Sequence, residues 1–187
     1  MDAPMMRSLP QSIEAEQSVI GAMLIDKNAM AKVFEKLEEE DFYRDGHKVI
    51  YNAIKEMYAK DMAVDLVTLL EHLKSADMLE KAGGVTYISE LSASVPTTAN
   101  LSSYIKIVEE KSTLRKLIKT STSIIEESYN NGGDVEKVID IAQKKIFDLA
   151  ENKDSKEYEP LSSVLERGFI EIERLFNNKG EITGVGS

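Results

Sequence analysis

The sequence predicts an all-α protein: a small globular helical bundle, then a long antiparallel helical hairpin and a tethered linker helix. Leu, Ile, Ala, Glu and Lys are abundant, tryptophan is absent and there are four prolines, a composition that favours helices. Apolar residues recur at the spacing of one helix face. A charged stretch of low hydrophobicity, residues 151–159, separates the last predicted helix from the rest.

The N-terminal part, residues 1–98, is predicted to be a globular head of short helices. Ser12 is the expected N-cap of the first helix, where Glu14 and Glu16 suit the positive first turn. This helix is expected to end near Ile25. Further helices are predicted from apolar residues at helical spacing: one after Asp26, one with Val49, Ile50, Ala53, Ile54 and Met57, one with Leu66, Leu69, Leu70 and Leu73, and one with Val85, Tyr87, Ile88 and Leu91.

Residues 99–152 are predicted to form the hairpin. One helix over residues 100–130 measures about 45 Å, because an α-helix rises about 1.5 Å per residue, and this is too long for a small head. Asn-Asn-Gly-Gly at residues 130–133 reverses the chain, and Asp134 caps the second helix. The stripe that faces the first helix is predicted to hold Val135, Val138, Ile139, Ala142, Ile146 and Leu149, with Ile141 and Phe147 off it.

Apolar side chains on the hairpin need more cover than two helices give each other. Self-association supplies it most simply, and the alternative is that the hairpin folds back on its own head. The predicted hairpin and dimer interface comprises Leu101, Tyr104, Ile105, Val108, Leu117, Val138, Ile139, Ala142 and Ile146.

Residues 153–187 are predicted to be a linker and a linker helix. Ser163 and Glu166 form a capping box. The apolar stripe of this helix, Leu165, Phe169, Ile172, Leu175 and Phe176, is predicted to dock on a different body, the alternative being its own domain.

The composition restricts which binding partners and which cellular compartment are expected for this chain. The formal net charge of −10 opposes a contact with phosphate, so no direct binding to nucleic acid is expected. The absence of cysteine excludes disulfides, thiolate metal sites and a cysteine nucleophile, and fits the cytoplasm. No apolar run approaches the roughly 20 residues that span a bilayer, so no membrane is expected.

No catalytic residue, metal site or cofactor site is predicted. A phosphate-binding loop is missing, and the nearest pattern, Gly184-Val185-Gly186-Ser187, lacks the lysine. His47 and His72 stand in no metal-binding motif and are expected at the surface. The acidic run at residues 38–41 is expected to be a solvated face. The tyrosines Tyr43, Tyr51 and Tyr87 are expected in the core or at an interface, with Tyr87 the best candidate for an interface.

Four strings in order resemble a known family: SIEAEQSVIGAMLID (residues 12–26), EDFYRDGHKVIYNAI (40–54), VDLVTLLEHL (64–73) and GGVTYISELSASVPTTANLSSYIKIVEEKSTLRKLI (83–118). Together they look like the N-terminal domain plus linker of a bacterial DnaB-family replicative DNA helicase. The resemblance runs from about Leu9 to the end. Leu9 itself replaces a proline that is usual in the family. The polar turn at residues 111–115 leaves open whether the interface between the two hairpin helices excludes water.

The resemblance implies a six-helix head and a hairpin that pairs with a neighbour's hairpin, three such dimers forming a collar on a hexameric motor. It implies docking of the primase C-terminal helicase-binding domain, for which the matching positions are Glu14, Tyr87, Ile118, Ile124 and Ile125. A helicase loader is a further expected partner. The RecA-like motor, with its ATP and Mg²⁺, is absent here, so ATP-dependent unwinding is expected only of the longer parent protein.

Two other classes remain open from the residues alone. One is a free-standing helical adaptor that binds a partner through its last helix. The other is a small carboxylate-dependent hydrolase, which needs a metal.

Overall fold

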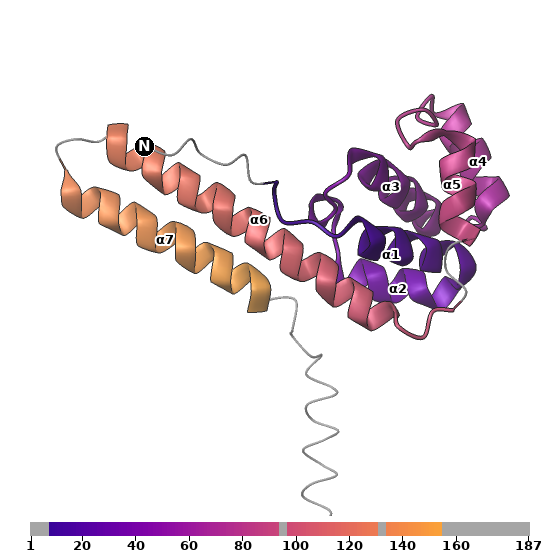
Figure 1. The fold of residues 1–187 in the computed structure, drawn as a ribbon, viewed down its shortest axis with the longest axis horizontal. Helices are drawn as coiled ribbons and strands as arrows, with labels where there is room; N and C mark the ends of the chain where they lie inside the picture. Colours follow the sequence, from indigo (N-terminus) through magenta and orange to yellow (C-terminus); the bar gives the residue numbers. More distant parts are fainter. Residues whose placement is uncertain (1–7, 94–96, 131–133, 155–187) are drawn as a thin grey trace, which may run out of the picture. The chain divides into compact units, whose positions relative to one another are not determined.

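The computed structural model describes residues 8–93, 97–130 and 134–154, with side chains up to residue 150. All regular elements in these ranges are helical, which confirms the predicted fold class (Figure 1). In chain order they are α1 (Ile13–Ile25), α2 (Lys27–Lys36), the 3₁₀ turn η1 (Glu39–Asp41), α3 (Asp45–Ala59), α4 (Leu66–Ser75), α5 (Gly84–Ala93), α6 (Leu101–Asn130) and α7 (Val135–Asp154). The linker-helix residues Leu165, Phe169, Ile172, Leu175 and Phe176 lie outside the described residues.

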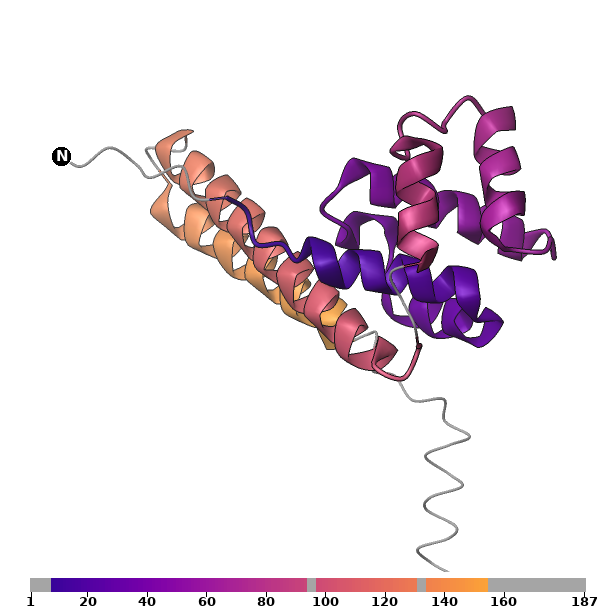
Figure 2. The same ribbon diagram turned by 45° about the vertical axis from the view of Figure 1, so that its right-hand side comes forward.

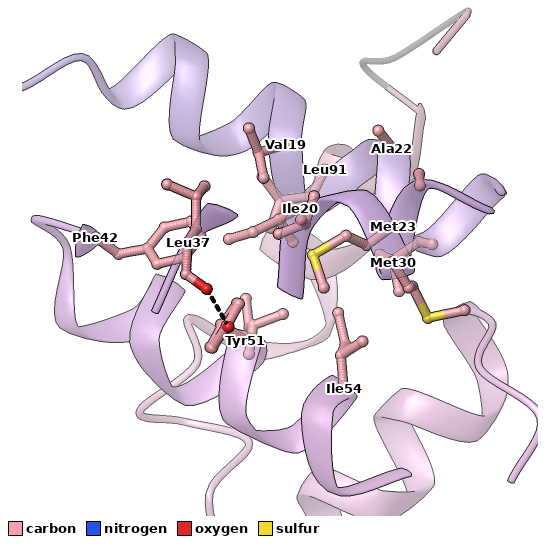
Figure 3. Packing of buried hydrophobic residues seen from close by; sticks show 14 of the residues in the cluster. Val19, Ile20, Ala22, Met23, Met30, Leu37, Phe42, Tyr51, Ile54 and Leu91 are labelled. Carbon is pink, nitrogen blue, oxygen red and sulfur yellow. Dashed lines mark hydrogen bonds between the residues drawn. The ribbon is translucent and has the colours of Figure 1, made fainter. Parts of the chain in front are cut away.

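Helix α1 is the centre of the head. Its buried residues lie on several sides of the helix, because α2, α3, α5 and α6 all pack against it. A helix surrounded in this way needs apolar residues nearly all round rather than on one stripe. Figure 3 shows Ile20 and Met23 of α1 among Met30, Tyr51 and Ile54 from the neighbouring helices.

Tyr51 of α3 adds a buried hydrogen bond to this core. Its side chain is fully buried, and its hydroxyl donates a hydrogen bond to the carbonyl oxygen of Leu37 over 2.6 Å, drawn as a dashed line in Figure 3. Burial, together with nearby carboxylates such as Glu38, raises the pKa of the Tyr51 phenol, which therefore stays a neutral donor. The bond fixes the chain between α2 and η1 against α3.

The helix starts follow local chemistry. Ser12 occupies the predicted N-cap position of α1 but its side chain makes no capping bond. Asp26 accepts a hydrogen bond from the backbone of Asn28, and Asp65 caps α4 with a reciprocal bond to Thr68. Asp134 accepts one from the backbone of Lys137 at the start of α7, as predicted. These caps satisfy backbone N–H groups that lack helical partners.

Helix α6 belongs to the head over its first three turns. Leu101, Ile105 and Val108 are buried in the head core, so the boundary predicted after residue 98 does not separate two packed bodies. One compact unit runs through Met1–Leu149, and a second comprises Ala150–Ser187. Within the first unit, the rest of α6 continues beyond the head with α7 antiparallel beside it, in both Figure 1 and Figure 2.

Candidate protein-docking surfaces

The hairpin beyond the head carries large apolar side chains on its outside. We call the exposed ones the hairpin surface: Leu114, Leu117, Ile118, Ile125 and Tyr129 on α6, and Val135, Ile139, Ile146 and Phe147 on α7. Their exposed fractions run from 41% at Leu117 to 85% at Tyr129. These exposed apolar side chains make the hairpin surface a candidate site for binding another protein.

The seam between α6 and α7 is polar at its middle. Lys145 of α7 donates a hydrogen bond to the hydroxyl of Ser123 over 2.6 Å, and its ammonium lies 4.0 Å from the carboxylate of Glu127. The inner side of α6 therefore carries polar groups here, while Ile118 and Ile125 lie 43% and 55% exposed. The seam thus includes polar contacts beside half-buried apolar residues such as Ile124 and Ile141, while other large apolar side chains of the hairpin remain exposed.

The predicted inner stripe of α7 is partly wrong. Ile139 and Ile146, predicted to face α6, are 50% and 44% exposed. Ile141, predicted to lie off the stripe, is half-buried. The half-buried Ile141, Ala142 and Lys145 mark the side of α7 that faces α6, and the bond from Lys145 to Ser123 agrees with this orientation.

The predicted dimer interface divides into three groups. Leu101, Ile105 and Val108 are 4%, 5% and 1% exposed, because they pack inside the head of the same chain. Tyr104, Val138 and Ala142 are half-buried. Leu117, Ile139 and Ile146 belong to the hairpin surface.

The predicted primase-docking residues lie on two parts of the chain. Ile118 and Ile125 belong to the hairpin surface, and Ile124 beside them is half-buried. Glu14 on α1 is exposed, and Tyr87 on α5 is half-buried. The amide of Gln17, one turn along α1 from Glu14, donates a hydrogen bond to the Tyr87 hydroxyl over 3.2 Å. Glu14 and Tyr87 therefore belong to one region, which we call the head surface.

Asp41 anchors α6 where that helix leaves the head. Its carboxylate accepts a hydrogen bond from the hydroxyl of Ser112 over 2.7 Å and one from the ammonium of Lys116 over 2.6 Å. Burial raises the pKa of Asp41, but the bonds from Lys116, from the backbone of Glu38 and from Ser112 outweigh it and lower the pKa to about 2. The expectation of a solvated face is therefore wrong for Asp41, which is 2% exposed.

Arg115 reinforces the same anchor. Its guanidinium donates hydrogen bonds to the carbonyl oxygens of Pro10 and Asp41 over 2.8 and 2.6 Å, and it lies 5.7 Å from the ring centre of Tyr43. The polar turn at residues 111–115 therefore joins α6 to η1 and to the segment before α1. It does not lie in the hairpin seam.

His47 is buried, so the expectation of a surface role is wrong for it. It is 0% exposed; its Nδ1 lies 2.6 Å from the Glu16 carboxylate and its Nε2 lies 2.5 Å from the Tyr87 hydroxyl. Sequence reasoning missed this cluster because Glu16 and Tyr87 are 31 and 40 residues from His47. No local pattern joins them. His72, in contrast, is half-buried beside Glu56.

Neither a metal site nor a membrane-spanning helix is found in the described ranges. No group of three or more His, Asp or Glu side chains there could hold a metal ion. No described helix combines the length and the apolar character that crossing a membrane requires.

The family model of the DnaB-like helicase N-terminal domain matches residues 8–110. This match covers more than half of the chain and includes the whole head with the buried start of α6. The chain belongs to this family. The resemblance drawn from the four strings is therefore confirmed.

Relatives of this DnaB-like domain are replicative helicases. The chain is 42% identical over 176 residues to the replicative DNA helicase DnaC of Bacillus subtilis (strain 168), covering 94% of this chain and 39% of the relative. It is 43% identical, with the same two coverages, to the replicative DNA helicase DnaB of Geobacillus stearothermophilus. The DnaB-like chain thus spans about two fifths of the length of these relatives.

Solved structures agree with the family. A crystal structure of the N-terminal domain of DnaB helicase from Mycobacterium tuberculosis superposes with a TM-score of 0.70 at 40% identity, covering 76% of this chain and 99% of that one. A second structure, of a DnaB-like replicative helicase and its interactions with primase, has a TM-score of 0.64 at 26% identity. It covers 94% of this DnaB-like chain and 39% of that chain.

Proposed function

We propose that this chain is the oligomerisation and primase-docking module of a replicative DNA helicase. The carrying observation is the hairpin, which holds Lys145, Ser123 and Glu127 in its seam and exposes apolar side chains on its outside. A hairpin that is stable by itself buries its apolar side chains inside, so this one fits a second chain that covers them.

The free energy available from burying the hairpin surface is sufficient for two chains to associate. Full burial of a large apolar side chain contributes roughly 1.5–3 kcal/mol, and the hairpin surface holds nine side chains per chain that are at least 41% exposed. Partial burial of several of them offsets the roughly 4–15 kcal/mol lost as translational and rotational freedom. We infer that two hairpins pair, and that three such dimers build the collar of a hexameric ring.

The rest of the function belongs to a longer protein in this proposal. The parent helicase unwinds DNA in the cytoplasm with ATP and Mg²⁺ bound to a motor domain, and the linker helix at residues 163–178 docks on a neighbouring motor. A helicase loader is a further partner. The relatives are named replicative DNA helicases and this chain spans 39% of them, which supports placing it in a longer helicase.

Sedimentation equilibrium over a concentration series tests the pairing. Ile125→Glu with Ile139→Glu introduces carboxylates into the hairpin surface while keeping a good helix former at both positions. The unchanged chain should gain mass with concentration, and the double variant should stay a monomer. Val67→Glu is the matched control, because Val67 is 70% exposed on the head and should not affect mass. Equal masses for the unchanged chain and the double variant at every concentration reject the pairing.

Calorimetric titration with the primase C-terminal domain from the same genome tests docking. The supporting observations are the related structure described with its interactions with primase and the exposure of Ile118. Ile118→Glu should weaken binding, and Val67→Glu should leave it unchanged. Docking elsewhere is indicated if Ile118→Glu binds as tightly as the unchanged chain.

A further inference from the structure

A buried chain of hydrogen bonds runs from α1 through α3 to the head surface. It starts at Glu16, whose carboxylate accepts the backbone N–H groups of Tyr43 and Arg44 over 2.8 and 3.4 Å. The same carboxylate binds Nδ1 of His47, and Nε2 of His47 binds the Tyr87 hydroxyl. The Glu16 and His47 side chains are 2% and 0% exposed, whereas Tyr87 is half-buried. These hydrogen bonds thus connect the interior of the head to Tyr87 at its surface.

The direction of these bonds follows from their partners. In the tautomer of His47 that donates Nδ1–H to this carboxylate, Nε2 accepts a hydrogen bond. The Tyr87 hydroxyl then donates its proton to Nε2, and its oxygen accepts from the amide of Gln17. In this arrangement the hydroxyl of Tyr87 donates its one proton to His47, within the head.

The ring of Tyr87 is held as firmly as its hydroxyl. The Arg44 guanidinium lies 4.5 Å from the ring centre. On another side lies Gly83, with φ of +107°, where an added Cβ would come within 2.6 Å of the ring. Residues from α1, α3 and the turn before α5 together fix one orientation of the ring.

A buried charged or polar pair is weak evidence for stability, because desolvation offsets much of its attraction. The Glu16–His47 pair does, however, fix the position of the Tyr87 side chain at the surface. Because His47 bonds to Glu16 on one side and to Tyr87 on the other, a change at either buried residue alters how the ring is presented.

We propose that His47, oriented by Glu16, is a positioning residue that fixes the ring of Tyr87 for primase, and that primase contacts this ring rather than its hydroxyl. This inference rests on the proposed docking function. It adds two residues that primase never touches and states which part of Tyr87 is recognised.

Calorimetric titration of the full chain with the primase C-terminal domain tests the inference. Tyr87→Ala should weaken binding most, since the ring itself is removed. Tyr87→Phe keeps the ring and removes the hydroxyl that bonds to His47 and Gln17, so it should weaken binding about fivefold. His47→Asn keeps a donor for Glu16 and lacks an atom that reaches Tyr87, so it should have the same effect.

Two comparisons separate positioning from a general loss of structure. The double variant Tyr87→Phe, His47→Asn should bind no more weakly than Tyr87→Phe alone, because that variant has already lost the bond to His47. His47→Gln, whose amide oxygen takes the place of Nε2, should recover part of the affinity. His72→Asn and Tyr58→Phe are matched controls on the head and should leave binding unchanged.

The possible failures are distinguishable. If Tyr87→Ala weakens binding while His47→Asn and Tyr87→Phe do not, docking stands and the positioning role is overturned. Additive effects in the double variant also overturn it, since they show that the His47 and Tyr87 substitutions act independently of the bond between them. If the unchanged chain does not bind primase, the docking proposal fails and this inference with it. Tyr87→Phe removes a single oxygen from a half-buried residue, so its result remains decisive even where a His47 variant does not fold.

Discussion

The head and the outer hairpin use the same apolar residue types in opposite ways. Ile20 and Ile54 of the head are 0% exposed, whereas Ile125 and Ile139 of the hairpin are 55% and 50% exposed. Both pairs lie on helices with apolar residues at helical spacing. The difference comes from the number of neighbours: several helices pack on α1, whereas among the described helices α6 is the one that lies beside α7. Spacing therefore predicts a helix face, and the surrounding elements decide whether that face is core or surface.

The polar groups of the two regions differ as well. In the described part of the chain every buried side-chain nitrogen and oxygen has a hydrogen-bond partner. In the head these groups, Glu16, Asp41 and His47, connect segments that are distant in sequence. In the hairpin, Lys145 connects α7 to its neighbour α6 only. Substitutions in the head should therefore affect folding, and those in the hairpin should affect association.

The largest expected contrast is between two isoleucine truncations. Ile54→Ala in the head core should lower the free energy of unfolding by about 2–5 kcal/mol, because it leaves a cavity in packed surroundings. Ile125→Ala should change it by less than about 0.5 kcal/mol, because its side chain already meets water. Urea unfolding at a concentration where the chain is monomeric measures both. Equal losses would show that the hairpin is covered within a single chain.

Asp41→Asn should have the next largest effect. The folded-state pKa of Asp41 is lowered from 3.8 to about 2, so its ionised form contributes about 2 kcal/mol of stability. This contribution is present above pH 3.8 and is lost as the pH falls through about 2. Unfolding measured from pH 7 to pH 2 should show this loss in the unchanged chain and a flatter profile in Asp41→Asn.

Asp45 supplies the control for this acid dependence. Its pKa is also lowered, by the hydrogen bond and charge of Lys48, but its carboxylate is exposed. Exposed pairs are screened by solvent and contribute little. Asp45→Asn should therefore leave the profile unchanged. A profile for Asp41→Asn as steep as that of the unchanged chain contradicts the anchoring of α6 by Asp41.

A smaller contrast is expected between two tyrosines. Tyr51→Phe leaves the buried carbonyl of Leu37 without its donor and should cost about 1–2 kcal/mol. Tyr129→Phe on the hairpin should cost nothing measurable in the monomer, because Tyr129 is 85% exposed. Thermal unfolding compares the two. A loss for Tyr129→Phe equal to that for Tyr51→Phe would show an intramolecular partner for its hydroxyl.

Features that depend on local sequence were predictable. The long helix predicted over residues 100–130 is α6, Leu101–Asn130, and Asp134 caps α7 as its side-chain chemistry indicates. These predictions hold because helix periodicity and capping involve residues a few positions apart.

Features that depend on contacts between distant residues were not predictable. Asp41 looks like part of a solvated acidic run until Ser112, 71 residues away, reaches it. His47 has no local sign of Glu16 and Tyr87. The orientation of α7 places Lys145 in the seam, where it bonds to Ser123. The apolar pattern does not show this polar contact.

The central claim is that the hairpins of two chains pair through their outer apolar side chains. Because the sequence has no cysteine, a single spin label can be attached at Ser121→Cys on α6 or, as a control, at Ala59→Cys at the end of α3; both sites are exposed. Pulsed dipolar spectroscopy then measures distances between chains. We predict a short, well-defined distance for the Ser121 label that disappears with Ile125→Glu and Ile139→Glu. A dimer in which only the Ala59 labels approach each other would contradict the claim.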